Sequence, residues 1–160
     1  DVSRVTDMSY MFSHQRSFNS DISKWDVSSV TDFGRAFDGC SKFNADLSRW
    51  DVSNAKYLSY MFQQTIHTGH GLENWETGKT RMMDGIFYHA TKFNGDLSKW
   101  DTSSNFNLKW AFRYNYEFTG ECLENWDVSK VTTLERAFEG SRSFNGNLKD
   151  WNVRSVGLIV

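Results

Sequence analysis

The sequence has 160 residues, of which 39% are hydrophobic and 16% aromatic, and its formal net charge is −2. This length normally corresponds to one domain. Acids and bases are interleaved, which excludes the basic footprint of a nucleic-acid-binding protein and the polybasic segment that binds anionic membranes. No apolar run reaches the ~18 residues of a membrane-spanning helix, so we expect no direct membrane insertion in this segment.

Tryptophan marks a repeat that runs along the whole chain. The interval is 25 residues, with one single-residue insertion, and the positions are Trp25, Trp50, Trp75, Trp100, Trp126 and Trp151. A period of this size indicates a solenoid, in which a coil buries its apolar face only against its neighbours. We predict a single domain of six coils and the start of a seventh, with the six at residues 1–25, 26–50, 51–75, 76–100, 101–126 and 127–151. Because the chain begins within a repeat, we expect it to be part of a longer protein.

Each coil contains the spacing L-x-x-W-x-V, for example Leu47, Trp50 and Val52. This is the spacing of the L-x-x-L-x-L core of a leucine-rich repeat. Trp50 and Val52 would point to one side of a strand of about five residues, 49–53, that pairs in parallel with its equivalents. The tryptophans should then lie in the interior, and Leu47 should reach Leu97 through Leu72.

The next apolar positions follow at spacings of three, three and one, as in Val30, Phe33, Ala36 and Phe37. These spacings favour one face of a short helix, and Thr31 occupies the position of its N-cap. The expected fold is therefore a right-handed α/β solenoid of the leucine-rich-repeat type, with one short parallel strand and one short helix per coil.

Residues that flank the tryptophan should face outward in two columns. The basic and polar column is Lys24, Arg49, Asn74, Lys99, Asn125 and Asp150, and the acidic column is Asp26, Asp51, Glu76, Asp101, Asp127 and Asn152. We interpret the columns as mutual charge compensation. A zwitterionic surface for a protein ligand, and calcium bound between acids of adjacent coils, are the alternatives.

Other polar residues are assigned structural roles. Repeated asparagines such as Asn44 should hydrogen-bond turn backbone along the stack. Cys40 and Cys122 lie three coils apart, beyond the reach of a disulfide, and are expected to be free thiols. A metal site is conceivable for three histidines in or next to irregular coil three, but we prefer solvated side chains, since no helical spacing brings them together; they are His67, His70 and His89. No cofactor site is predicted.

Coils three and five depart most from the repeat, at Thr68–Gly71 and Phe118–Cys122. Departures of this kind are where function is often added to a repeat, although ordinary drift is the preferred interpretation. The apolar end of the chain, Val156–Val160, should be covered by more chain or by a neighbouring subunit.

The words Trp-Asp-Val-Ser-x-Val-Thr-Asp-Met-Ser-Tyr-Met-Phe and Phe-Asn-x-Asp-Leu-Ser-x-Trp occur at residues 1–12, 18–33 and 43–53. They resemble the BspA-like leucine-rich-repeat surface proteins over the whole chain, least closely in coils three to five. The resemblance implies a secreted or surface-anchored binding protein that acts in adhesion. It supplies no catalytic residues.

One position in each expected helix is not restricted to apolar residues, as the core positions are, and we predict it to be exposed. Together with three tyrosines of the following loops it forms a candidate contact surface, the contact stripe, which consists of Tyr10, Arg35, Tyr60, Trp110, Arg136, Tyr88, Tyr114 and Tyr116. Tyrosine, tryptophan and arginine are enriched in interfaces. We therefore expect a non-catalytic scaffold that binds a protein or glycan ligand outside the cell. The alternative is a structural or linker subunit buried in a large intracellular or organellar assembly.

Overall fold

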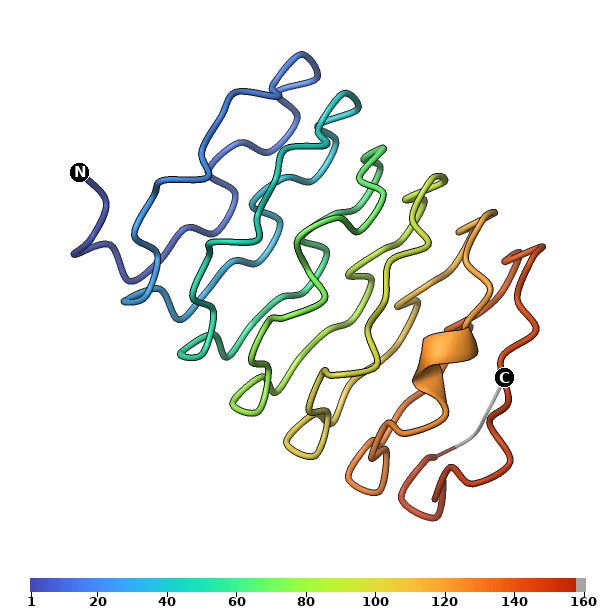
Figure 1. Ribbon diagram of the computed structural model, residues 1–160. Helices are drawn as coiled ribbons and strands as arrows, with labels where there is room; N and C mark the ends of the chain where they lie inside the picture. Colours follow the sequence, from blue (N-terminus) through green and yellow to red (C-terminus); the bar gives the residue numbers. More distant parts are fainter. Residues whose placement is uncertain (158–160) are drawn as a thin grey trace.

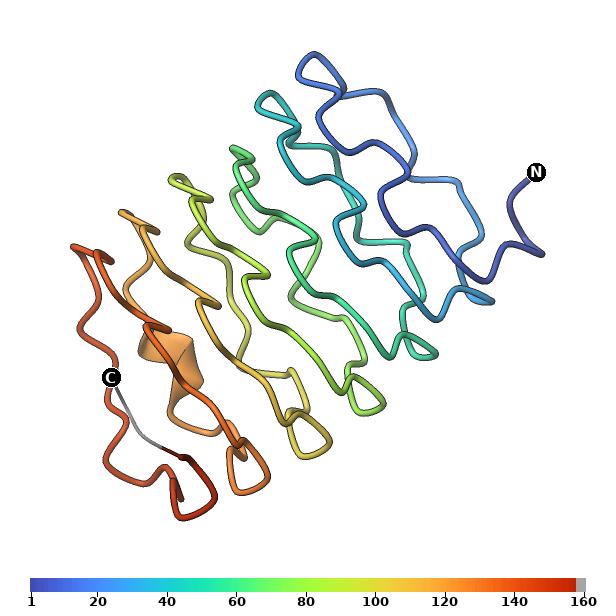
Figure 2. The same ribbon diagram turned by 180° about the vertical axis from the view of Figure 1, so that it is seen from behind.

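The chain forms a stack of similar coils that runs from the N-terminus at one end to the C-terminus at the other (Figures 1 and 2). This is a computed structural model that describes residues 1–157. Parallel backbone bridges join one residue of each coil to its equivalent in the next, at Asp7, Asp32, Tyr57, Met82, Asn107 and Thr133. The predicted repeat solenoid is confirmed.

The predicted strand and helix of each coil are wrong. Within residues 1–157 the regular secondary structure is a single 3-10 helix, η1 (Glu121–Leu123), and the parallel bridges are isolated. Around Trp50 the chain makes turns instead of a strand, because the Trp50 N–H donates to the Leu47 carbonyl at 3.0 Å and the Ala55 N–H donates to Val52 at 2.8 Å.

The segment expected to be a helix is a series of overlapping turns. In coil one Met11 donates to the Met8 carbonyl and Ser13 to the Tyr10 carbonyl, three residues back in each case. Gln15 likewise donates to the Phe12 carbonyl, and the third residues of turns 8–11 and 12–15, Tyr10 and His14, have φ values of 57° and 61°. A left-handed residue at the third position of a turn defines type II geometry, which cannot continue a right-handed helix.

The turn geometry directs alternate N–H groups toward the next coil. Met8 donates to Asp32 O at 2.8 Å and Tyr10 donates to Gly34 O at 2.9 Å, and the same pairs recur between later coils. Thr31, the expected N-cap, also bonds to a neighbouring coil, but in the opposite direction, since its hydroxyl donates to the Thr6 carbonyl of the preceding coil at 3.3 Å. In a helix these backbone N–H and C=O groups would hydrogen-bond to one another within the helix. Here they hydrogen-bond between coils instead.

The tryptophans join the coils on their side of the stack through side-chain hydrogen bonds. Trp50 Nε1–H donates to the Ile22 carbonyl at 3.1 Å, and the equivalent bond is made by Trp75, Trp100, Trp126 and Trp151. Trp50 is 4% exposed and Trp100 3% exposed. The prediction that these rings lie in the interior is confirmed.

The core is a column of phenylalanine rings that crosses every complete coil. Successive centroids lie 5.6–5.9 Å apart along Phe12, Phe37, Phe62, Phe87, Phe112 and Phe138. Leu47, Leu72 and Leu97 are fully buried beside it. Because each ring contacts the rings of the coils before and after it, the coils form one continuous core.

The two outward columns are exposed as expected, but their charges are not compensated through direct ion pairs. Within residues 1–157 no ion pair joins the basic column to the acidic one. Asp26 instead accepts hydrogen bonds from the hydroxyl and backbone N–H of Ser28, and Asp127 accepts the N–H of Ser129. These bonds hold the pKa of both carboxyls below the usual value. The recurring Asp-x-Ser word therefore closes a turn.

The repeated asparagines do hydrogen-bond along the stack. Asn19 Oδ1 accepts the N–H of Asn44 at 2.8 Å, and Asn44 Oδ1 accepts the N–H of Thr68 at 3.0 Å. The same contact joins Asn94 to Thr119. The asparagine prediction is confirmed.

Candidate interaction surface

The variable positions of the contact stripe share a backbone conformation that the sequence pattern did not reveal. Their φ values lie between 51° and 58°, at Tyr10, Arg35, Tyr60, Trp110 and Arg136, and Gly85, which has the same repeat position in coil four, has a φ of 59°. These residues lie at the left-handed corner of the turn series. Tyr10, which is 62% exposed, and Arg136 are exposed as predicted, but Arg35, Tyr60 and Trp110 are half-buried and Gly85 is buried, so the predicted exposure is wrong at these positions. The backbone conformation at this corner thus explains why the position is not restricted to apolar residues.

In the N-terminal half of the stripe, an arginine lies between two tyrosines of adjacent coils. The Arg35 guanidinium carbon is 4.2 Å from the Tyr60 ring centroid and 5.9 Å from that of Tyr10. Arg35 Nη1 also pairs with Asp38 Oδ2 at 2.9 Å. The arginine is thus both stacked on rings and neutralised by a carboxylate.

Gly85 allows the two halves of the stripe to meet. A Cβ atom at this position would lie 2.2 Å from Tyr60 Cε1, so the glycine leaves the space in which the Tyr60 ring lies. From there Tyr60 meets Trp110 edge-on, two coils along, with centroids 6.5 Å apart. A side chain at residue 85 would interrupt this contact.

The C-terminal half is centred on Arg113, which sequence reasoning missed. Its guanidinium carbon is 4.6 Å from the Tyr114 ring, 5.6 Å from Trp110 and 5.8 Å from Tyr88. Arg113 Nη2 pairs with Glu139 at 2.9 Å, and this hydrogen bond raises the pKa of the guanidinium. Arg113 shares its repeat position with Asp38 and Tyr88, and the variability of that position was a usable signal.

Two predicted residues lie outside this cluster. Arg136 pairs with Glu139 at 3.6 Å. Tyr116 lies under the guanidinium of Arg142, at 4.8 Å. The structure therefore brings together six of the eight predicted residues, which are Tyr10, Arg35, Tyr60, Tyr88, Trp110 and Tyr114.

The histidines are not brought together. His67 is fully buried, so the prediction that it is solvated is wrong. Its Nδ1 accepts the Gly69 N–H at 3.0 Å and its Nε2 lies 3.1 Å from the Ala45 carbonyl, which fixes a neutral ring; burial lowers its pKa to about 4. His70 is exposed, and the His89 ring lies against that of Tyr114, with centroids 4.8 Å apart and a tilt of 47° between the rings. Within residues 1–157 no three His, Cys, Asp or Glu side chains could hold a metal ion.

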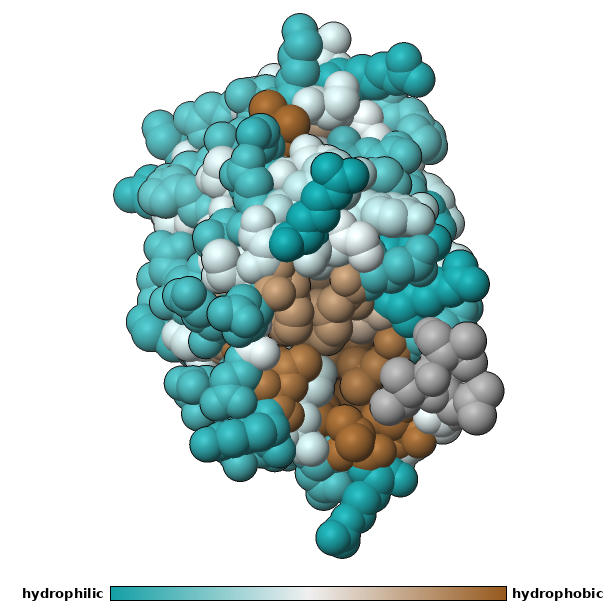
Figure 3. Space-filling view, turned by 90° about the vertical axis from the view of Figure 1, so that its right-hand side faces the viewer, coloured by the Kyte–Doolittle hydropathy of each residue, from teal (hydrophilic) through white to brown (hydrophobic). Residues whose placement is uncertain are grey.

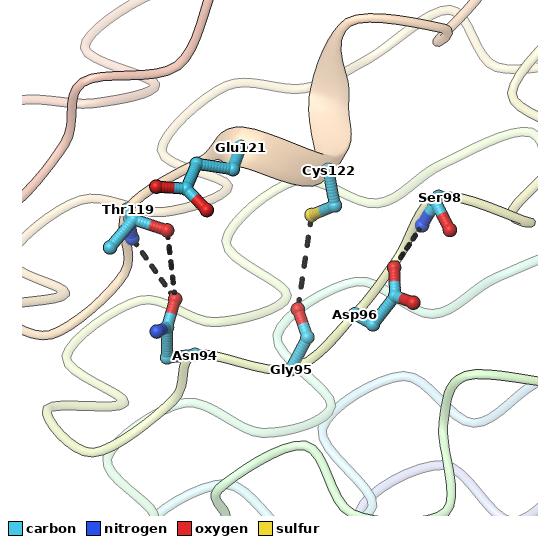
Figure 4. A pocket seen from close by; sticks show the side chains of 7 residues that line it. All are labelled: Asn94, Gly95, Asp96, Ser98, Thr119, Glu121 and Cys122. Atoms are coloured by element: carbon cyan, nitrogen blue, oxygen red, sulfur yellow. Dashed lines mark hydrogen bonds between the residues drawn. The ribbon is translucent and has the colours of Figure 1, made fainter.

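Coil four and irregular coil five together line a polar pocket of about 400 Å³ next to η1 (Figure 4). Thr119 donates from its N–H and its hydroxyl to Asn94 Oδ1 at 3.0 and 3.3 Å, and Asp96 accepts the Ser98 N–H at 2.9 Å. The Cys122 thiol faces the Gly95 carbonyl at 3.8 Å. The polar groups of the pocket wall are therefore mainly hydrogen-bonded to one another.

Both cysteines are free thiols, as predicted. Burial raises the pKa of the Cys122 thiol. Burial likewise raises the pKa of Cys40 to about 11, and its sulfur donates to the Phe12 carbonyl at 3.0 Å. Thiols with raised pKa values are poor nucleophiles, because the thiolate is the reactive form.

Comparisons with known proteins give one family. Searches of curated proteins and of solved structures find no match. Within residues 1–157 no helix is long and apolar enough to cross a membrane. Residues 1–68 and 64–159 match the family model described as "Mycoplasma protein of unknown function, DUF285". These two matches cover almost the entire chain, which therefore belongs to the DUF285 repeat family.

Proposed function

We propose that this chain is a non-catalytic repeat scaffold that binds a protein or glycan partner at the cell surface through the contact stripe. The observation that carries the proposal is the continuity of the cluster, from Tyr10 in coil one to Tyr114 in coil five. Aromatic rings provide large contact areas at a low cost in conformational entropy. Together with arginine they dominate the binding energy in interfaces.

The roles of the polar residues support a non-catalytic function. Aspartates close turns, the buried histidine is neutral, and both thiols have raised pKa values. The turn aspartates, the buried histidine and the two thiols are thus engaged in holding the repeat. This distribution favours a scaffold whose binding surface is its outer face.

The resemblance to BspA-like surface proteins supports the extracellular location. The sequence motifs on which this resemblance is based have structural roles in the coil. The Asp-x-Ser motif closes a turn, and the tryptophan hydrogen-bonds to the preceding coil. We infer that the coil is a variant of the leucine-rich-repeat plan in which turns replace the strand and the helix.

The test compares binding of the chain and of a stripe variant, Tyr60→Ala with Trp110→Ala, to intact cells and to arrays of extracellular proteins and glycans. We expect the double variant to lose at least about tenfold in affinity, the effect of removing one interface anchor or more. Lys24→Ala with Lys99→Ala, on the tryptophan side, is the control and should bind as the unaltered chain does. Equal binding by the stripe variant would contradict the proposal.

The C-terminal end of the stack favours a second function, that of a subunit in a larger assembly. Figure 3 shows an apolar surface at this end. The last coil leaves Phe138, Phe144, Leu148 and Trp151 partly buried, and Val153 is 39% exposed. The end predicted to be covered spans Val156–Val160, of which 158–160 lie outside the described residues. Recovery of fixed partners at constant stoichiometry after cross-linking in cells would support the assembly function.

A further inference from the structure

One outward position of the coil changes its chemistry in three consecutive coils. It is threonine in coils one, two and six, and it is Lys56, Arg81 and Phe106 in coils three, four and five. Backbone hydrogen bonds establish that these residues are equivalent, because the Arg81 N–H donates to the Lys56 carbonyl at 2.9 Å and the Phe106 N–H donates to the Arg81 carbonyl at 3.0 Å. All three residues are exposed, Phe106 by 40%.

Threonine at this position helps to join the coils. The hydroxyls of Thr31 and Thr132 donate to a carbonyl of the preceding coil at 3.3 and 3.0 Å. Lysine, arginine and phenylalanine have no hydroxyl group to make this bond. The three replacements therefore remove a contact within the stack and place two cations and an apolar ring on its surface.

The next residue of the coil changes in the same three coils. It is aspartate in coils one and two, and it is uncharged in the coils that carry Lys56, Arg81 and Phe106. In chain order these residues are Asp7, Asp32, Tyr57, Met82 and Asn107. The acid is thus absent where the cations appear, and both changes make the surface of coils three to five more positive.

A third cation lies beside the first two. Lys79 is exposed, and its Nζ donates to Asn54 Oδ1 at 2.7 Å, which holds the ammonium over coil three. Within residues 1–157 neither Lys56, Lys79 nor Arg81 forms an ion pair. Like charges in register on neighbouring backbone segments repel each other. A bound anion would relieve this repulsion.

We propose that this basic patch, which consists of Lys56, Lys79, Arg81 and Phe106, binds a short acidic segment of a protein partner. Carboxylates of the segment pair with the three cations, and an apolar side chain next to them covers the Phe106 ring. The patch spans two intervals between coils of about 4.8 Å each, the length of roughly three residues of an extended chain.

The surroundings of the basic patch favour a short anionic ligand over a long one. A long polyanion gains affinity from every further cation along its path. Toward the N-terminus the same positions carry threonine and aspartate, and the aspartates Asp7 and Asp32 would repel such a polymer. The basic patch shares no residue with the contact stripe, so the inference goes beyond the proposed function and does not depend on it.

The experiment titrates the isotope-labelled chain with the peptide acetyl-Glu-Glu-Leu-Glu amide and follows backbone amide signals. We expect saturable changes at Lys56, Arg81 and Phe106 that weaken as the salt concentration rises. The uncharged peptide acetyl-Gln-Gln-Leu-Gln amide should cause none of them. Acetyl-Glu-Glu-Gly-Glu amide, which lacks the apolar side chain, should bind more weakly.

Three results would overturn the proposal. The first is the absence of saturable changes with the acidic peptide, and the second is equal changes with the uncharged one. The third is saturation of the same amides by heparin at a lower concentration of negative charge than the acidic peptide requires, because this would assign the basic patch to an anionic glycan.

Variants that restore the threonine of the other coils make the test specific. Lys56→Thr with Arg81→Thr should weaken peptide binding at least about fivefold, the effect of losing two exposed ion pairs. Its urea midpoint should stay equal or rise, because the repulsion between the two cations is removed. The matched control is Lys24→Thr with Lys42→Thr, which removes the same charge from exposed residues of coils one and two and should bind normally. Unchanged binding by the first variant would contradict the inference.

Phe106→Thr tests the apolar contact separately. It should weaken binding of the leucine peptide and leave binding of the glycine peptide as it is, whereas equal effects on both would show that the ring makes no contact with the ligand. The basic patch and the contact stripe can also fail independently. If the unaltered chain binds cells but the acidic peptide causes no saturable change, the basic patch is wrongly assigned and the scaffold function stands.

Discussion

His67 occupies, in coil three, the place in the core that a phenylalanine fills in other coils. Its ring centroid lies 5.7 Å from that of Phe43 and 5.0 Å from that of Phe62. Burial lowers its pKa from 6.5 to about 4, so the folded state holds the ring neutral. Between these two values the unfolded chain binds a proton that the folded chain does not.

Acid should therefore destabilise the protein before its carboxylates titrate. As pH falls from 7 to 5, the His67 contribution should reduce the free energy of unfolding by roughly 2 kcal/mol. The turn aspartates, whose pKa values are lowered below 3.8, lose their contribution only at lower pH. Burial lowers the pKa of His89 as well, which adds a loss of the same sign.

Urea unfolding of the unaltered chain and of His67→Phe at pH 7 and pH 5 measures this contribution. His89 is present in both proteins, so the difference between their losses isolates residue 67. We expect the variant to lose about 2 kcal/mol less than the unaltered chain over this interval. Equal losses would show that His67 is not held neutral in the folded state.

Single residues also mark the limit of prediction from sequence. The inward tryptophans, the asparagine contacts and the free thiols followed from spacing and chemistry alone. The left-handed φ at Tyr10, Arg35 and Trp110 did not, because such a conformation is unusual for residues other than glycine. Only Gly39, Gly85 and Gly140, which share the left-handed positions, hinted at it.

At the scale of the coil, a type II turn series imitates the spacing of a helix. Both conformations make bonds across three or four residues, so apolar positions three apart reach the core in either case. The turn series and the helix differ in the acceptors of the remaining N–H groups, and the spacing of apolar residues in the sequence does not reveal these acceptors. In this protein they donate to the next coil, and the turn segment thereby becomes an inter-coil contact.

On the tryptophan side of the stack, the indole N–H groups form the hydrogen bonds between coils. Trp100 Nε1–H donates to the Leu72 carbonyl at 2.8 Å, and Trp100 is 3% exposed. Trp100→Phe should lose this bond and leave a buried carbonyl without its donor, which costs about 1–3 kcal/mol. Lys99→Ala, at the exposed neighbour, should change stability by less than about 0.5 kcal/mol. Urea midpoints of the two variants provide the comparison, and similar values for both would contradict the structural role of the indole.

At the scale of the whole molecule, stability depends on contacts between neighbouring coils. A solenoid behaves approximately as a line of units, in which a central defect removes two interfaces and a terminal defect removes one. The family match covers nearly the full chain, in keeping with one continuous array. The six grouped residues of the contact stripe span coils one to five, so their alignment also requires an unbroken stack.

Phe87 is the central position at which this dependence can be measured. It is fully buried, and its ring contacts Phe62 in coil three at 5.6 Å and Phe112 in coil five at 5.6 Å. Phe87→Ala should cost about 3–5 kcal/mol, the usual range for a buried phenylalanine. Phe12→Ala, in the first coil, removes a partly exposed ring that stacks on one neighbouring coil, and it should cost less.

Hydrogen exchange distinguishes a line of coupled coils from independent ones. In Phe87→Ala the amides of Met83, Phe87 and His89, which donate to coil five, should exchange faster together with those of Leu58 and Phe62, which donate to coil four. In Phe12→Ala faster exchange should stay within coils one and two. If the central substitution accelerated exchange only in its own coil, the stack would not be held by its interfaces, and the stripe would lose its physical basis as a single binding surface.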